Sequence, residues 1–324
     1  MKAVVYDEYG GPDVLHVAEV EPPTPKGDEI VVRVRAAEVT KSDCELRSFD
    51  FPVKWFWLPM RLALGVRRPK RPILGAYFAG EVQAVGDGVS TFAVGDEVYG
   101  SSQLRLGAYG EVLCVPDSYT VVPKPTNMSF EQAAAVPLGG LNALHFLRLA
   151  EVQEGDAVLV NGAGGSIGTF GIQIARSMGA EVTAVDAGHK EQMLLDLGAK
   201  HFIDYEQQDF ASNAGAYDVV FNMVASRSFA SCMAALKPGG RYVTANPKLS
   251  DMLRATVSKP LHGKKAAFAF AGEKPEELRD LTAMIEAGDL SATVDQIFPM
   301  SEAAQAHHRV ETEQRLGSIV LTLG

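Results

Sequence analysis

Short apolar runs separated by glycine and proline turns occupy the N-terminal third of the chain. These runs are rich in valine and other strand-forming residues, and they lie at 1–7, 29–39, 79–86, 96–100 and 110–116. Turn residues between consecutive runs are typical of antiparallel strands. The pattern therefore predicts a mostly β, barrel-like domain.

From about Ser129 the rhythm changes to helix, strand, helix. Apolar runs of about five residues with little polar alternation indicate parallel strands that are buried on both faces. Such runs lie at 156–162, 181–186, 201–205, 217–224 and 241–246, with amphipathic helices between them. This is the pattern of a doubly wound nucleotide-binding domain.

After a further helical stretch at 274–288, strand-like runs return at 294–300 and 317–324. The simplest interpretation is that these last strands complete the N-terminal domain. The sequence thus predicts an α/β chain in which a doubly wound parallel-sheet (Rossmann) domain, 124–272, is inserted into a mostly β catalytic domain, 1–123 plus 273–324.

Charge and composition narrow the classes of partner. The chain has 324 residues, of which 47% are hydrophobic, and its formal net charge is −10. This charge argues against a nucleic-acid partner, because no basic surface is implied. No stretch approaches the roughly 20 apolar residues that span a bilayer, and the first residues do not resemble a signal peptide. We therefore expect a cytoplasmic protein without a membrane span, whose three separated cysteines are small buried side chains.

A glycine-rich stretch between a predicted strand and a predicted helix is the strongest local signal. Gly162, Gly164, Gly165 and Gly168 lie within "VNGAGGSIGTF". Residues without a Cβ allow a sharp turn, a close approach to a pyrophosphate and exposure of helix N-terminal amides to its charge. Asp186 ends the next predicted strand, where a carboxylate contacts the ribose of a dinucleotide. Strand, loop, helix and acid together predict dinucleotide binding.

An aromatic stretch interrupts the first domain between Phe49 and Arg71. It holds five aromatic residues ahead of a basic cluster. Two interpretations stay open: a surface loop whose aromatic rings close over the core, or a lid over a ligand cleft.

The ordered series of motifs resembles one family along nearly the whole chain. The series includes "RAAEVTKSDCELR", "PILGAYFAGEVQAVGDGVSTFAVGDEVYG", "AAAVPLGGLNALHFL", "GAGGSIGTFGIQIAR" and "LGAKHFIDY". It is similar to the medium-chain dehydrogenase/reductases and, among them, to the zinc-independent quinone oxidoreductase branch. The resemblance implies a GroES-like barrel for the catalytic domain, a nicotinamide cofactor and a homodimer.

Zinc is not expected, because the ligands used by related zinc alcohol dehydrogenases are missing. The resemblance places a Gly-His-Glu motif where this chain has Gly75, Ala76 and Tyr77. Cys44 alone cannot build a tetrahedral site. No metal site is therefore predicted.

The resemblance and the glycine loop together define the predicted cofactor site. Asp186 favours NADH, whereas Lys190 and Tyr205 stand where NADPH-using relatives surround the extra phosphate, so we expect both cofactors with a slight preference for NADPH. The predicted cofactor-binding residues are Asn142, Gly162, Ala163, Gly164, Gly165, Ser166, Ile167, Gly168, Asp186, Lys190 and Tyr205.

Without zinc, an electron-poor acceptor suits the chemistry best. A quinone, or the C=C bond of an α,β-unsaturated carbonyl, accepts hydride once donor and acceptor are aligned and the developing oxyanion is stabilised. The resemblance implies Thr40, Asp43 and Arg47 as catalytic-pocket residues, and Tyr77 is a further candidate. Two alternatives stay open: a zinc-free dehydrogenase or lyase acting on another substrate, and a non-catalytic NADPH-binding protein.

Overall fold

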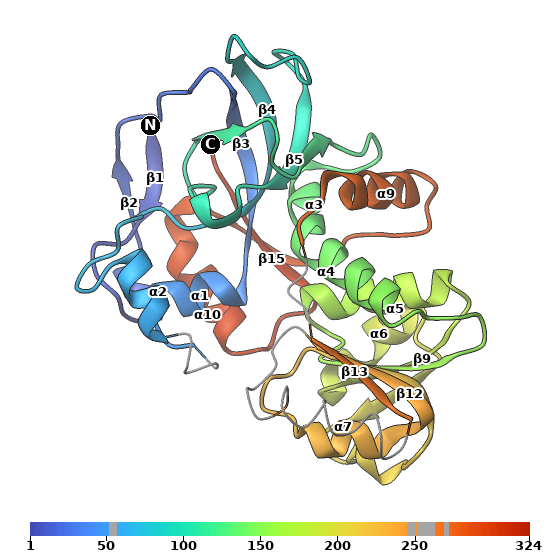
Figure 1. The fold of residues 1–324 in the computed structure, drawn as a ribbon. Helices are drawn as coiled ribbons and strands as arrows, with labels where there is room; N and C mark the ends of the chain where they lie inside the picture. Colours follow the sequence, from blue (N-terminus) through green and yellow to red (C-terminus); the bar gives the residue numbers. More distant parts are fainter. Residues whose placement is uncertain (52–56, 245–250, 252–262, 269–271) are drawn as a thin grey trace. The chain divides into compact units, whose positions relative to one another are not determined.

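A computed structural model of the chain describes residues 1–51, 57–244, 251, 263–268 and 272–324 (Figure 1). Two of the aromatic residues singled out in the sequence, Trp55 and Phe56, lie outside these ranges, as does the end of the predicted run at 241–246.

The contacts divide the chain into two compact units. The first comprises Met1–Pro137, Glu273–Gly288 and Ala292–Gly324, and the second comprises Leu138–Gly272 and Asp289–Ser291. The sequence pattern began the second domain at 124, whereas residues 124–137 join the first unit because helix α3 packs on its strands. The functional division into catalytic and cofactor domains stays a prediction.

The first unit is built on a seven-stranded sheet with the order β14-β15-β3-β4-β5-β7, and β6 pairs with β3 off this path. All the neighbouring pairs are antiparallel except β14 with β15. The strands are β3 (Glu29–Val39), β4 (Tyr77–Val85), β5 (Glu97–Ser101), β6 (Val112–Pro116), β7 (Val121–Pro123), β14 (Val294–Pro299) and β15 (Ser318–Thr322). The mostly β expectation is confirmed, although the described pairings do not join β7 to β14 into a closed barrel.

A two-stranded antiparallel ribbon and several helices complete this unit. They are β1 (Lys2–Val5), β2 (His16–Glu19), α1 (Lys41–Ser48), α2 (Trp57–Leu64), α3 (Phe130–Ala134), α9 (Pro275–Glu286) and α10 (Ala303–Glu311). Valines and isoleucines of the strands form one core with side chains of α1 and α10. The C-terminal strand β15 lies between β14 and β3, so the chain end is part of the same core as the N-terminal strands.

The second unit holds a six-stranded parallel sheet with the order β10-β9-β8-β11-β12-β13. Its elements are α4 (Val136–Leu149, which begins in the first unit), β8 (Ala157–Asn161), α5 (Ser166–Ser177), β9 (Glu181–Asp186), α6 (Glu191–Asp196), β10 (His201–Asp204), β11 (Tyr217–Asn222), α7 (Phe229–Ala235), β12 (Leu236–Thr244) and β13 (Lys265–Phe268). In chain order this is 3-2-1-4-5-6, the doubly wound arrangement that the sequence predicted. The direction of connection reverses between β8 and β11, which defines the switch point where ligands of this fold bind.

Two further sequence expectations are met. All three cysteines are free and buried. Among the described residues, no helix is both long and apolar enough to cross a bilayer.

Candidate functional site

The glycine loop of the second unit folds tightly against the start of α5. Gly162 leaves β8 with a φ of 83°, a left-handed conformation that favours glycine. A Cβ on Gly168 would lie 2.4 Å from the carbonyl oxygen of Gly162 and 2.5 Å from the Cα of Ala163. The positive φ therefore explains the glycine at 162 and the short distances explain the glycine at 168, where the loop backbone packs against the N-terminus of α5.

The first turn of α5 presents unsatisfied hydrogen-bonding groups. Gly165 occupies the N-cap position and supplies no side chain, and the first turn contains no acidic residue. The buried hydroxyl of Ser166 has no hydrogen-bond partner in the part of the chain that the structure describes. A helix N-terminus with free amides and an orphaned hydroxyl fits a phosphate group. The residues present therefore fit the pyrophosphate of a dinucleotide.

A buried ion pair covers this loop. The ammonium of Lys190 lies 2.9 Å from one carboxylate oxygen of Asp186, and both side chains are less than a tenth exposed. The other oxygen of Asp186 accepts a 2.7 Å hydrogen bond from the amide of Gly164. A Cβ on Gly164 would meet the Lys190 side chain at 2.3 Å, so this glycine makes room for the lysine. Asp186, which favours NADH in the sequence, and Lys190, which favours NADPH, thus form a single buried ion pair.

The other predicted cofactor residues differ in their burial and in their hydrogen-bond partners. The amide of Tyr205 donates to the carbonyl of Asp186, and its side chain is 58% exposed. Ala163 is fully buried and Ile167 is half-buried in the loop. Asn142 lies on α4, where its amide donates to the carbonyl of Leu138. The structure therefore brings the glycine loop, Asp186 and Lys190 together, whereas it gives Asn142 a partner within its own helix.

Sequence reasoning missed an asparagine pair at the switch point. The Asn161 side-chain amide donates to Asn222 Oδ1 at 2.7 Å, and both residues end parallel strands, β8 and β11. Both side chains are buried. A polar residue at the carboxyl end of each of two apolar runs was the available signal, because these ends border the ligand crevice of the fold.

In the first unit, Thr40 and Asp43 form the N-terminal cap of α1. The Thr40 hydroxyl accepts from the amide of Asp43, while the Asp43 carboxylate accepts from the amide and hydroxyl of Thr40 at 2.9 and 2.7 Å. This reciprocal capping box is encoded by the spacing of Thr and Asp. The predicted pair is thus adjacent, and each side chain holds the other.

Asp43 also ties the helix to the loop before β4. Its second carboxylate oxygen accepts a 3.1 Å hydrogen bond from the amide of Gly75. Burial raises the pKa of this carboxyl, and hydrogen bonds from Thr40, Gly75 and Tyr109 oppose the shift. The geometry therefore makes Asp43 a group that fixes backbone in place.

Arg47 and His307 lie in a buried network behind the cap. Arg47 is 1% exposed, donates to the carbonyl of Gly10 and pairs with Glu311. His307 is fully buried, with Nδ1 3.4 Å from the Cys44 sulfur and Nε2 3.2 Å from the Tyr109 hydroxyl. Burial, with a smaller contribution from Arg47, lowers the pKa of His307 to about 3.

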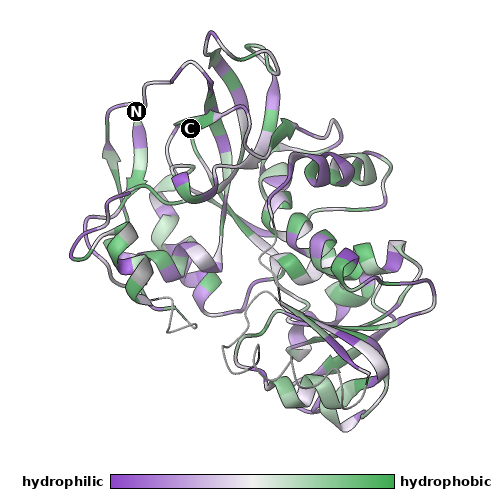
Figure 2. Cartoon of the chain, in the orientation of Figure 1, coloured by the Kyte–Doolittle hydropathy of each residue, from purple (hydrophilic) through white to green (hydrophobic). Residues whose placement is uncertain are grey.

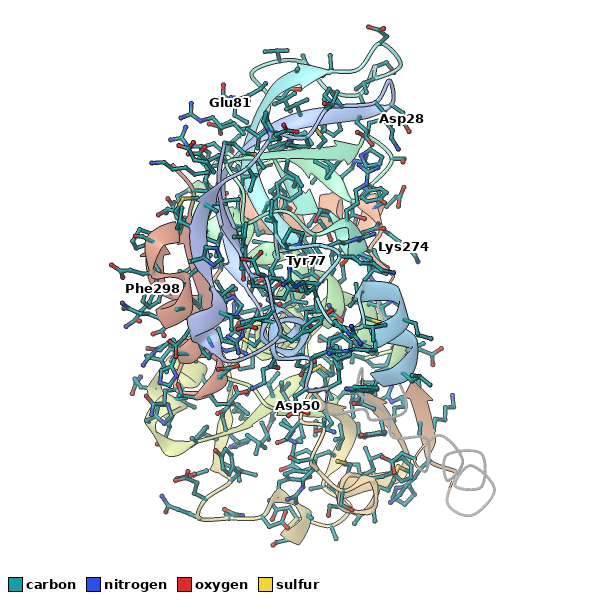
Figure 3. All side chains as sticks on the ribbon, turned by 90° about the vertical axis from the view of Figure 1, so that its left-hand side faces the viewer. Asp28, Asp50, Tyr77, Glu81, Lys274 and Phe298 are labelled. Atoms are coloured by element: carbon teal, nitrogen blue, oxygen red, sulfur yellow. The ribbon has the colours of Figure 1, made fainter. Side chains whose placement is uncertain are left out.

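Tyr77 meets an acid that sequence reasoning did not find. Its hydroxyl donates to Glu273 at 3.0 Å, and Figure 3 labels Tyr77 together with Lys274, the residue that follows Glu273. Burial and the Glu273 carboxylate hold the pKa of Tyr77 well above its ordinary value, so the phenol stays protonated. The two residues are 196 positions apart, and no local pattern links them.

The position expected to lack a metal ligand is occupied by Ala76, which is half-buried beside the core. Within the described ranges, no group of three or more His, Cys, Asp or Glu side chains is arranged to hold a metal ion. Cys44 is instead committed to His307.

Comparisons with known proteins address the family. Residues 26–126 match the family model described as "Alcohol dehydrogenase GroES-like domain", and residues 197–321 match the one described as "Zinc-binding dehydrogenase". A quinone oxidoreductase of Pseudomonas aeruginosa is 30% identical, with 99% of each chain covered. The chain belongs to the quinone oxidoreductase family of medium-chain dehydrogenase/reductases. It is accordingly an oxidoreductase of that superfamily, as the motif series indicated.

Two further relatives show the range of the family. The chain is 30% identical to an NADPH-dependent alkenal/one oxidoreductase of Arabidopsis thaliana. The aligned region covers 99% of this chain and 79% of the relative. The structure of the quinone oxidoreductase from Coxiella burnetii superimposes with a TM-score of 0.89 at 29% identity, over 100% of this chain and 99% of the other. The predicted combination of a Rossmann and a GroES-like domain is thereby confirmed.

Proposed function

We propose that this protein reduces quinones or the C=C bond of α,β-unsaturated carbonyls with a nicotinamide cofactor and without zinc. The observation that carries the proposal is the glycine loop, where an uncapped helix N-terminus and an orphaned Ser166 hydroxyl fit a pyrophosphate. The names of the Pseudomonas and Arabidopsis relatives support the two acceptor classes.

The second unit supplies the proposed cofactor site. The α5 amides and Ser166 would bind the pyrophosphate, and the Asp186–Lys190 pair would face the adenosine ribose. When bound, the reduced nicotinamide supplies the hydride. Because Lys190 already neutralises Asp186, the site tolerates the extra phosphate of NADPH better than a lone carboxylate would. We therefore propose use of both cofactors, with NADPH slightly preferred.

The first unit supplies the proposed acceptor site. Tyr77 keeps its proton because burial and Glu273 raise its pKa, and we propose that its O–H leaves Glu273 and donates to the developing enolate or quinol oxygen when the acceptor binds. Thr40 would contact cofactor or acceptor, and Asp43 would hold Thr40 and Gly75 in position. Arg47 is enclosed by its partners, so we assign it a positioning role within α1.

Two further expectations concern the oligomeric state and the location of the protein. We propose a homodimer, which light scattering would test, and a cytoplasmic location.

The absence of catalytic zinc is proposed because Ala76 carries no ligand and Cys44 is committed to His307. Elemental analysis should find less than stoichiometric zinc, and a chelator should leave activity unchanged. One zinc per chain, with activity lost on chelation and restored by the metal, would refute this.

A panel assay tests the function directly. Cofactor oxidation is followed with simple enones, quinones, saturated aldehydes and alcohols. Turnover confined to the enones or quinones supports the proposal. The Tyr77→Phe variant should reduce kcat at least about tenfold for enones, because a hydrogen-bond donor to the developing oxyanion is lost. Phe92→Leu, a change at a half-buried position against the core of the same unit, serves as the control and should leave kcat unaltered.

A further inference from the structure

Helix α2 is oriented with its charge toward the protein and its leucines toward solvent. Arg61 is the only charged residue in its sequence, WLPMRLAL. The guanidinium carbon lies 4.2 Å from the ring centre of Tyr9 and 4.3 Å from that of Phe49. The Trp57 ring adds a third contact at 5.7 Å. Cation–π contacts of this kind hold the arginine against the rings.

The end of the helix is fixed as well. The Tyr9 hydroxyl donates to the carbonyl of Gly65 at 2.9 Å and contacts that of Leu64 at 3.2 Å. Phe49 and Phe51 beneath the helix are 5% and 8% exposed. These two rings pack edge to face on each other, and Phe49 also packs on Tyr9 and Trp57. The orientation of α2 is therefore set by several contacts to the folded unit.

The outward side of α2 is apolar, and its large side chains are exposed in the part of the chain that the structure describes. Leu58 and Leu62 are four residues apart on one face of the helix and are 59% and 61% exposed. Trp57 and Val66, at either end, are 41% and 58% exposed. We call these four residues the α2 apolar face; Figure 2 colours α2 mostly green, toward the hydrophobic end of the scale. Contiguous exposed apolar side chains of this kind mark an interaction surface.

A basic cluster continues directly from this face. Arg67, Arg68, Lys70 and Arg71 are all exposed. The ammonium of Lys70 donates to the carbonyl of Leu62 at 3.1 Å, which keeps a positive charge next to the apolar face. Four cations gathered here contrast with the formal net charge of −10 of the whole chain. The surface thus combines exposed apolar groups with a local positive charge.

We propose that the α2 apolar face and the basic cluster dock on the surface of an anionic phospholipid bilayer. Apolar side chains that enter the acyl boundary beside cations that attract lipid phosphates are the two parts of an interfacial site. A second copy of the chain fits less well, because a two-fold contact on this face would bring the two basic clusters together. The docking is peripheral and reversible, and it does not depend on the proposed reductase function.

The chain provides its own probe for this surface. One of its two tryptophans, Trp57, belongs to the α2 apolar face. The full-length protein is mixed with vesicles of phosphatidylcholine alone, or of phosphatidylcholine with phosphatidylglycerol. Co-sedimentation and tryptophan emission are recorded at low and high salt. We expect binding and a blue shift with the anionic vesicles only, both reduced at high salt.

Variants separate the two parts of the site. Arg67→Glu with Arg68→Glu should weaken vesicle binding at least about tenfold. Leu58→Ser with Leu62→Ser should abolish the blue shift. The matched control is Val94→Ser with Leu104→Ser, at apolar positions that are 65% and 70% exposed elsewhere in the same unit. The control should bind as the wild type does, and thermal unfolding verifies that each variant is folded.

Three outcomes would overturn the proposal. The first is no co-sedimentation with anionic vesicles, and the second is binding that the charge reversal leaves unchanged. The third is a blue shift caused by NADPH or an enone alone, without vesicles, which would assign the stretch to a ligand lid. Light scattering tests whether a second copy of the chain binds this face instead. A mass that falls by half in Leu58→Ser/Leu62→Ser, with no vesicle binding in the wild type, would show a contact between copies.

Discussion

Among single residues, His307 shows most clearly how burial controls the charge of a side chain. Its neighbours are the Cys44 thiol and the Tyr109 hydroxyl, neither of which compensates a positive charge. Arg47 nearby opposes that charge further, although burial is the larger cause. The imidazole is therefore neutral in the folded protein, whereas in the unfolded chain it titrates normally.

Acid should destabilise the fold through this one side chain. The pKa of His307 falls from 6.5 to about 3 on folding, so the unfolded chain binds one more proton between these values. The stabilisation is complete above pH 6.5 and is lost as the pH falls toward 3. Between pH 7.5 and 5.0 we expect about 2 kcal/mol of the free energy of unfolding to disappear through this group. Urea denaturation of the wild type and of His307→Gln at both pH values measures it by difference, because Glu45, whose pKa burial raises to about 7, changes the free energy of unfolding in the opposite direction.

The His307→Gln variant removes the titration. Its unfolding free energy should be lower than that of the wild type at pH 7.5, and the difference should shrink at pH 5.0. The adjacent His308→Gln, at an exposed position of the same helix, should retain the wild-type dependence. Parallel pH profiles for wild type and His307→Gln would show that the imidazole is not the group responsible.

Lys190 tests how a buried pair sets cofactor choice. Lys190→Ala leaves the Asp186 carboxylate buried and unpaired, at a cost of about 3 kcal/mol or more. We expect NADPH affinity to fall more than NADH affinity, because the 2′-phosphate loses its cation. Calorimetry with both cofactors gives the ratio of dissociation constants, and thermal unfolding gives the stability.

Two further variants separate these effects. Lys200→Ala breaks an exposed pair with Glu181 and should change neither quantity. The double change Asp186→Asn with Lys190→Met should recover stability without recovering NADPH binding. An unchanged ratio of the two dissociation constants in Lys190→Ala would mean that the lysine has no part in cofactor choice.

At the scale of elements, the conformation of the loop between β8 and α5 depends on which atoms lie closest to each of its glycines. Gly168 meets backbone, at 2.4 Å from the Gly162 oxygen, whereas Gly164 meets the flexible end of the Lys190 side chain. The same substitution should therefore have different results at the two positions.

Gly168→Ala should lower the free energy of unfolding by about 2 kcal/mol and weaken NADPH binding, because the backbone has to shift. Gly164→Ala should cost less, since Lys190 can move, although it would disturb the pair with Asp186. Thermal unfolding and cofactor titration of both variants provide the comparison. If Gly164→Ala proves the more damaging for stability, the contacts described for the loop are wrong.

The elements also show what the sequence can and cannot predict. The strand–glycine loop–helix unit and the capping box of Thr40 and Asp43 are local, and a few adjacent residues specify each of them. The partners of Tyr77 and Cys44 lie 196 and 263 positions away, and only the folded sheet brings them together. The contacts begin the second unit at Leu138, because α3 packs on β3 and β4, and no local pattern in the sequence specifies that packing.

For the whole molecule, two units with separate cores divide the proposed work: one binds the cofactor and the other the acceptor. This division is the central claim, and family membership leaves it open, since one fold serves many reactions. Hydride transfer from a held cofactor to an electron-poor carbon requires close approach and one defined face. Tyr77 would then transfer its hydrogen bond from Glu273 to the oxygen on which charge develops.

The most direct measurement follows the hydride itself. Cofactor deuterated at nicotinamide C4, on each face in turn, is supplied with a simple enone and with a quinone. Mass spectrometry then measures the deuterium content of the products. The account predicts deuterium at the β-carbon of the saturated ketone from one face only, with transfer that persists after chelation of metals. Transfer to a saturated aldehyde with the enone and the quinone untouched, or cofactor binding without any transfer, would contradict it.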